Sequence, residues 1–227
     1  MYFDPMYLVF MAPALLLAFF AQMKVRSAYG TYTKTANSRG LTGLDAARVI
    51  LGPEGLGHVQ IEGTRGELTD HYDPRSKKLA LSAGVAQQPS VAALAIVAHE
   101  IGHALQDHQG YAPLKLRGAI VPAVTVSSWV APLLFFAGLL LGLTELAWVG
   151  VILFGASVLF ALVTLPVEFD ASRRALRLLQ SYNLADGREL QGAKTVLDAA
   201  ALTYVAALAQ TLMTLLYYVS ILGRRRE

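Results

Sequence analysis

No cysteine occurs among the 227 residues of this chain, so disulfide bonds and thiolate metal sites are excluded. Charged residues are also scarce, at 15% of the sequence against roughly 25% in typical soluble domains. The formal net charge of +3 is too small to indicate a nucleic-acid partner. Hydrophobic residues instead make up 55% of the chain and gather into long blocks, which indicates membrane spans rather than an unusually large soluble core.

Four of these blocks are long enough to cross a bilayer as helices: Pro5–Met23, Ala119–Leu143, Leu146–Val167 and Ala199–Leu222. The first lacks a charged segment before it and an obvious small-residue cleavage site, so we interpret it as an uncleaved anchor rather than a signal peptide. Only Thr144 and Glu145 separate the second block from the third, which predicts a helical hairpin. The fourth block carries Gln210 in its middle, and whether it crosses the bilayer fully is left open.

The positions of lysine and arginine orient these spans. Basic residues follow the first block, precede the second and follow the third, whereas the tip of the hairpin has none. Because cytoplasmic loops are enriched in positive charge, this pattern predicts an integral membrane protein with a cytoplasmic polar portion and an external amino terminus. The membrane is expected to be a bacterial-type cell membrane. Arg224, Arg225 and Arg226 would lie outside if the fourth block crosses, so either it crosses incompletely or the tail departs from the rule.

The polar stretches between the blocks predict short elements: a helix at Gly43–Leu51, strands at His58–Glu62, Leu68–Tyr72 and Lys78–Ser82, a helix from Val91 to about His108 and another from Glu168 to about Gln180. The turn residues Asp73–Ser76 join the last two strands into a hairpin. Ser90 is placed to cap the Val91 helix through its side-chain oxygen. A final helix is expected to begin after Asn183–Gly187 and to run into the fourth block.

The stretch VAHEIGHAL, residues 97–105, carries the chemistry of the chain. His99 and His103 lie one turn apart on one face of a helix, so their imidazoles can share a metal ion. Glu100 lies beside that position, where it can take a proton from a metal-bound water, as in the H-E-x-x-H zinc motif. The alternative is a pair of ordinary core histidines, but Glu100 would then need a separate buried partner, because an unpaired buried carboxylate is costly. The motif therefore predicts a Zn²⁺ site, which needs a third protein ligand if it is catalytic.

Two nearby sources of a third ligand are disfavoured. The extended metzincin pattern needs glycine and histidine at positions that Gln106 and Gln109 occupy here. His108, five residues after His103, faces about 140° away on a helix.

Glu168, at the end of the third block, is the preferred third ligand. An ionisable group beside hydrocarbon usually has a specific partner. The alternative is an interfacial carboxylate paired with Arg173 or Arg174. His99, His103 and Glu168 together make the two-histidine, one-glutamate set of a thermolysin-type zinc site.

Three stretches taken together resemble the YugP-like membrane zinc metallopeptidases. They are VAHEIGHALQ, the two-span hairpin followed by LPVEFDASRRA, and the upstream DHYDPRSKKLALS. The resemblance covers essentially the whole chain, and more distantly the chain is similar to the HtpX and CAAX-prenyl membrane gluzincins. It implies a mostly α, multi-span membrane protein, with the H-E-x-x-H helix and a small antiparallel sheet in a gluzincin-like catalytic domain.

The related families place their third ligand in an E-F-x-A-D pattern whose final acid supports a ligand histidine. In this chain the string is Glu168-Phe169-Asp170-Ala171-Ser172, so Ser172 replaces that acid. Asp170, Asp107 or a backbone carbonyl could substitute, since metal-bound histidines nearly always donate their other N–H.

The predicted activity is that of a zinc-dependent endopeptidase acting on membrane-associated or unfolded proteins, with Glu100 as the general base on the zinc-bound water. Candidate donors to the developing oxyanion are His71, Tyr72, His58 and Arg173, although the two histidines are more simply explained as surface strand residues. The Lys78–Ser82 strand could offer its edge to an extended peptide. The alternative function is a non-catalytic metal-binding membrane scaffold or a partner-recruiting protein.

The chain is accordingly predicted to divide into transmembrane helix 1 at 5–23, a soluble zincin-like domain at 24–118, a transmembrane hairpin at 119–167, a third-ligand helix and connection at 168–198, membrane helix 4 at 199–222 and a basic tail at 223–227. Expected partners are peptide or protein substrates and membrane lipid. An oligomer or a regulatory membrane partner is compatible with the G-x-x-x-G stretch Gly138–Gly142, which could equally pack inside the monomer.

Overall fold

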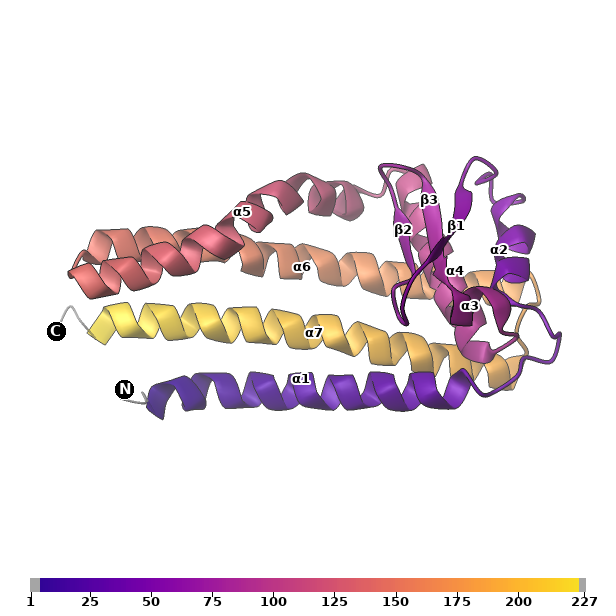
Figure 1. The fold of residues 1–227 in the computed structure, drawn as a ribbon, viewed down its shortest axis with the longest axis horizontal. Coiled ribbons are helices and arrows are strands. Elements are labelled where there is room, and N and C mark those ends of the chain that lie inside the picture. Colours follow the sequence, from indigo (N-terminus) through magenta and orange to yellow (C-terminus); the bar gives the residue numbers. More distant parts are fainter. Residues whose placement is uncertain (1–4, 225–227) are drawn as a thin grey trace. The chain divides into compact units, whose positions relative to one another are not determined.

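The computed structural model describes residues 5–224, and Arg225, Arg226 and Glu227 of the predicted basic tail lie outside the described residues. The described chain is mostly helical, with three short strands (Figure 1). In chain order the elements are α1 (Pro5–Tyr32), α2 (Gly43–Leu51), β1 (Gln60–Thr64), β2 (His71–Asp73), β3 (Lys78–Ser82), α3 (Ala83–Gln87), α4 (Val91–His108), α5 (Ala112–Leu141), α6 (Thr144–Ser181) and α7 (Gly187–Arg224).

The chain divides into two compact units. One unit, which we call the helical unit, comprises Met1–Ala21, Lys115–Leu165 and Thr203–Glu227. The other, which we call the mixed unit, comprises Gln22–Leu114 and Pro166–Leu202. The domain boundaries suggested by the sequence remain predictions.

Among the described residues, four helices are long and apolar enough to cross a membrane, namely α1, α5, α6 and α7. Each contains most or all of one of the four predicted apolar blocks, and three of them extend well beyond it. Helix α6 continues beyond the third block to Ser181, and the fourth block lies within α7, which begins at Gly187 as expected. Long helices therefore carry the chain from apolar segments into polar ones without a break.

Close packing of α5 on α6 holds the hairpin of the helical unit together. A Cβ atom at Gly138 would lie 2.4 Å from the backbone nitrogen of Ala147, and one at Gly150 would lie 2.6 Å from that of Phe135. Gly142 has a φ of 70° in the turn, a conformation that favours glycine. The glycines of the G-x-x-x-G stretch are thus used inside the monomer, for contact and for the turn.

The sheet of the mixed unit has the order β1-β3-β2. β2 pairs antiparallel with β3, which confirms the predicted hairpin, but β1 pairs parallel to β3, so the sheet is mixed and the expectation of a purely antiparallel sheet was wrong on this point. The reason is that β3 inserts between the two earlier strands, and no local turn signal encodes that insertion. β2 also begins later than predicted, since Leu68 adopts a left-handed φ of 55° that an extended strand does not allow.

The position of β3 corrects a second expectation. Both edges of β3 are occupied, by β1 and by β2, and most of its side chains are buried. The Lys78–Ser82 strand therefore has no edge to offer to a peptide substrate.

Helix α4 is the centre of the mixed unit. Most of its residues are buried, and Ser90 caps it as predicted by accepting a hydrogen bond from the Ala93 N–H at 3.1 Å. The strands β2 and β3 lie against it (Figure 1). A Cβ atom at Gly102 would lie 2.7 Å from the carbonyl oxygen of Ala171, so α4 and the polar end of α6 are in direct backbone contact. This contact brings the H-E-x-x-H helix to Glu168.

Candidate metal centre

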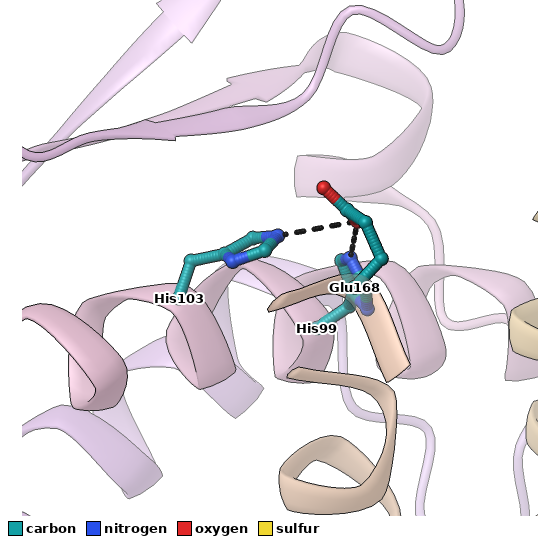
Figure 2. Close-up of side chains that lie close together, drawn as sticks. All are labelled: His99, His103 and Glu168. Atoms are coloured by element: carbon teal, nitrogen blue, oxygen red, sulfur yellow. Dashed lines mark hydrogen bonds and ion pairs between the residues drawn. The ribbon is translucent and has the colours of Figure 1, made fainter. Parts of the chain in front are cut away.

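Three side chains from two helices point toward one another in the mixed unit (Figure 2). His99 and His103 come from successive turns of α4, and Glu168 comes from α6. The Oε2 atom of Glu168 lies 3.3 Å from Nε2 of His99 and 3.5 Å from Nε2 of His103. The structure thus brings together the three residues that the sequence suggested as a ligand set.

The spacing and burial of these groups fit a zinc ion. Tetrahedral zinc with bonds of about 2.0–2.1 Å places its ligand atoms about 3.3–3.4 Å apart, close to the two distances from Glu168 to the imidazoles. Glu168 is 2% exposed, and a buried carboxylate is costly unless a cation compensates its charge. Two histidines and one glutamate also leave the fourth coordination position open, as catalytic zinc sites require.

Glu100 occupies the place expected of a base beside such a metal. Its side chain is buried, and its Oε2 atom accepts a hydrogen bond from the backbone N–H of Tyr72 in β2 at 2.9 Å. Burial raises the pKa of Glu100, and the nearby imidazoles of His99 and His103 only partly oppose this rise. A carboxylate with a raised pKa and a fixed orientation is suited to accepting a proton and releasing it again.

The strand that holds Glu100 is itself anchored to α4. The hydroxyl of Tyr72 donates a hydrogen bond to Asp107 at 2.7 Å, and Lys77 forms an ion pair with the same carboxylate. Burial, together with this hydrogen bond, raises the pKa of the Tyr72 hydroxyl, so it remains a donor. Asp107, considered as support for a histidine, thus supports β2 instead.

The second nitrogen of each imidazole faces a neutral side chain. Nδ1 of His103 lies 3.0 Å from Oε1 of Gln106, and Nδ1 of His99 lies 3.3 Å from Oγ of Ser172. The hydroxyl of Ser172, at the position where the resemblance led us to expect an acid, faces Nδ1 of His99. Asp170 contacts His103 only through Gln106, because it accepts a hydrogen bond from the Gln106 amide at 2.9 Å.

Comparison with known proteins agrees with this geometry. Residues 7–223 match the family described as "Putative neutral zinc metallopeptidase". The chain belongs to this family. It is also 46% identical over 214 residues to a protein of Bacillus subtilis (strain 168) named "Putative membrane protease YugP", covering 94% of this chain and 95% of the relative. No solved structure matches the chain.

Membership of the family confirms several expectations. Zinc is the metal of the family, and the cluster of His99, His103 and Glu168 is the group in the described part of the chain that could hold it. The membrane relative and the four apolar helices place the protein in a membrane. The roles of individual side chains in the site remain predictions.

The alternative partners considered for Glu168 are engaged elsewhere. Arg174 pairs with Asp170 and donates to Gln109, and Arg173 lies 3.6 Å from Asp170. These contacts favour the metal-ligand interpretation of Glu168 over an interfacial ion pair. They also leave Arg173 largely exposed, which gives no support to its suggested contact with an oxyanion.

The remaining histidines lie outside the cluster. His71 is exposed and its Nδ1 lies 2.8 Å from the carbonyl oxygen of Thr69. The ring centroids of His58 and His108 are 6.0 Å apart, and the two rings are tilted by 37°. His108 is therefore not part of the candidate ligand set, as its helical position predicted.

Gln106 is the residue of the site that sequence reasoning missed. It was noted only as a mismatch to the metzincin pattern. The available signal was its spacing, three residues after His103, which places both side chains on one face of α4.

Proposed function

We propose that this protein is a membrane-embedded, zinc-dependent endopeptidase in which His99, His103 and Glu168 hold the metal and Glu100 is the general base. The observation that carries the proposal is the arrangement of the buried Glu100 carboxylate next to a three-donor cluster in which both distances from Glu168 to the imidazoles fit zinc. Membership of a zinc metallopeptidase family supports it.

The chain's own groups account for the proton transfers of peptide hydrolysis. A bound zinc ion would polarise the scissile carbonyl and acidify the attacking water. Glu100 takes the proton from that water while the Tyr72 N–H holds one of its carboxylate oxygens. It then delivers the proton to the leaving amine, which restores the carboxylate for the next cycle.

An extended peptide is best accommodated along β2. This strand lies at the edge of the three-stranded sheet, and its residue Tyr72 contacts Glu100 through the backbone. A substrate strand added at this edge would gain backbone hydrogen bonds that do not depend on its sequence, from groups of β2 other than the Tyr72 N–H that bonds to Glu100. Such binding suits exposed segments of membrane-associated or unfolded proteins, and the pattern of basic residues supports a cytoplasmic location for this edge.

A non-catalytic metal-binding scaffold is the alternative function. Glu100 argues against it, because a scaffold has no use for a buried carboxylate that lies beside the metal cluster without belonging to the ligand set. The absence of cysteine also disfavours a structural zinc site, which usually uses thiolates.

The decisive experiment replaces Glu100 with glutamine in the full-length protein in detergent. Glu100→Gln should retain zinc, measured by elemental analysis, and lose hydrolysis of casein by about 10²- to 10⁴-fold, the usual contribution of a general base. Glu62→Gln, which removes an exposed carboxylate paired with Lys78, is the matched control and should cleave normally. Cleavage by Glu100→Gln at the wild-type rate would show that the proposed mechanism is wrong, and a zinc-loaded wild type without activity would favour the scaffold.

A further inference from the structure

Gln106 is the most deeply buried polar side chain next to the candidate metal cluster. It has no exposed surface, yet all its hydrogen-bonding atoms have protein partners. Its Nε2 atom donates to the carbonyl oxygen of Val167 at 2.8 Å and to Oδ2 of Asp170 at 2.9 Å. Its Oε1 atom faces Nδ1 of His103 at 3.0 Å. One side chain of α4 thus links a ligand histidine to the start of the polar part of α6.

These contacts leave only one orientation for the amide. An amide nitrogen has only donor hydrogens and an amide oxygen has only acceptor lone pairs. Val167 offers a carbonyl oxygen, which can only accept, and the Asp170 oxygen also accepts a hydrogen bond from Arg174, so both sites call for donors. The NH₂ group must therefore face α6, and the oxygen must face His103.

The orientation of the amide determines the tautomer of His103. Because Oε1 of Gln106 can only accept, Nδ1 of His103 must carry the hydrogen. In the neutral imidazole, Nε2 then bears the lone pair, and this is the atom that faces Glu168 at 3.5 Å. His99 has no such restraint from Ser172, since a hydroxyl can donate or accept.

We propose that Gln106 is a positioning residue that accepts a hydrogen bond from Nδ1 of His103 and thereby turns Nε2 toward the metal site. This inference rests on the proposed function in that His103 is taken as a zinc ligand. A neutral amide thus does here what a carboxylate does in many zinc sites. Its two hydrogen bonds to α6 also fix the position of His103 relative to Glu168.

Zinc affinity gives the first test, on the full-length protein in detergent with a competing chelator. Gln106→Leu should weaken zinc binding by about 10- to 100-fold, the usual effect of removing the partner of a ligand histidine. Gln109→Leu is the matched control, because Gln109 lies on the next turn and contacts Arg174 rather than a histidine. It should leave the dissociation constant within about twofold of wild type, and an unchanged constant in Gln106→Leu would overturn the inference.

Gln106→Glu separates a positioning role from a purely structural one. A glutamate keeps an acceptor for the His103 N–H but loses both donors to α6, so it should be at least as destabilised as Gln106→Leu and yet bind zinc more tightly. If zinc binding instead follows thermal stability across the two variants, the residue is structural and the proposal fails.

The tautomer itself can be read without any substitution at Gln106. In zinc-loaded, ¹⁵N-histidine-labelled protein, His103 should show a hydrogen on Nδ1 and a metal-bound Nε2, with the signal assigned by its loss in His103→Ala. A metal bound at Nδ1 would overturn the inference even if Gln106 variants fail to fold. Failure of the wild-type protein to bind zinc would overturn the proposed function instead, so the two failures are distinguishable.

Discussion

The helical unit and the mixed unit satisfy their buried polar groups in different ways. In the described part of the helical unit, the buried polar residues are Ser127 and Thr164, and each hydroxyl bonds to a carbonyl on its own helix. In the mixed unit, the corresponding residues include Glu100, Gln106 and Glu168, and each contacts a different element of the fold. A helix in lipid requires its polar groups to form hydrogen bonds within the helix itself, since no water is available there.

This difference indicates where the two units can tolerate change. A hydroxyl that bonds within its own helix is satisfied wherever that helix lies. A side chain that bonds across elements is satisfied only if the whole arrangement is preserved. Substitutions in the mixed unit should therefore change zinc binding and chemistry, whereas those in the helical unit should change stability alone.

Among the tests of this difference between the units, removal of a metal ligand should have the largest effect, and the effect should be on zinc binding. His99→Ala, His103→Ala and Glu168→Ala should each weaken zinc binding by more than about a hundredfold, because losing a ligand exceeds the cost of losing its supporting residue. His108→Ala is the control within the same unit and should keep the wild-type zinc content, measured by elemental analysis. Full zinc content in Glu168→Ala would remove that residue from the site.

Glycine substitutions should have the next largest effect, and they should distinguish the mixed unit from the helical unit. Gly102→Ala inserts a methyl group 2.7 Å from the carbonyl oxygen of Ala171, and Gly150→Ala inserts one 2.6 Å from the nitrogen of Phe135. Each should cost about 1–3 kcal/mol through overpacking, measured by thermal unfolding in detergent.

Zinc binding should then distinguish the two variants. Gly102→Ala should also weaken zinc binding, because the contact that it disturbs brings α4 to α6, whereas folded Gly150→Ala should bind zinc normally. Gly155→Ala, on α6 with open space around its Cβ position, is the control and should be neutral. Equal zinc affinity in the first two variants would break the comparison.

Loss of a single hydroxyl should have the smallest effect in either unit. Tyr72→Phe removes the bond to Asp107, which should cost about 1 kcal/mol and slow hydrolysis by less than about tenfold, because the backbone N–H on Glu100 remains. Thr164→Val removes a bond to the carbonyl of Phe160 on its own helix and should change stability by less than about 0.5 kcal/mol, with activity unchanged. A larger effect from Thr164→Val than from Tyr72→Phe, in unfolding and in casein hydrolysis, would contradict the distinction.

Much of the fold could be predicted because its signals are local. The four apolar blocks, the Gly43–Leu51 helix and the capped α4 helix each depend on periodicity, length or a capping residue within the segment itself. The pairing of β1 with β3 could not be predicted in the same way. It depends on which strand inserts between two others, and the sequence of a strand does not specify which strand it pairs with.

By itself, the sequence determined that His99 and His103 share one helical face with Glu100 beside them, because 3.6 residues per turn is a property of the backbone. Only the tertiary structure decided how Glu168, 69 residues further along the chain, reaches the same point, and that Gln106 rather than an acid faces His103. The physical reason is the contact of Gly102 with Ala171. Two helices can approach so closely only where one lacks a side chain, and that approach brings Glu168 of α6 to the two imidazoles of α4.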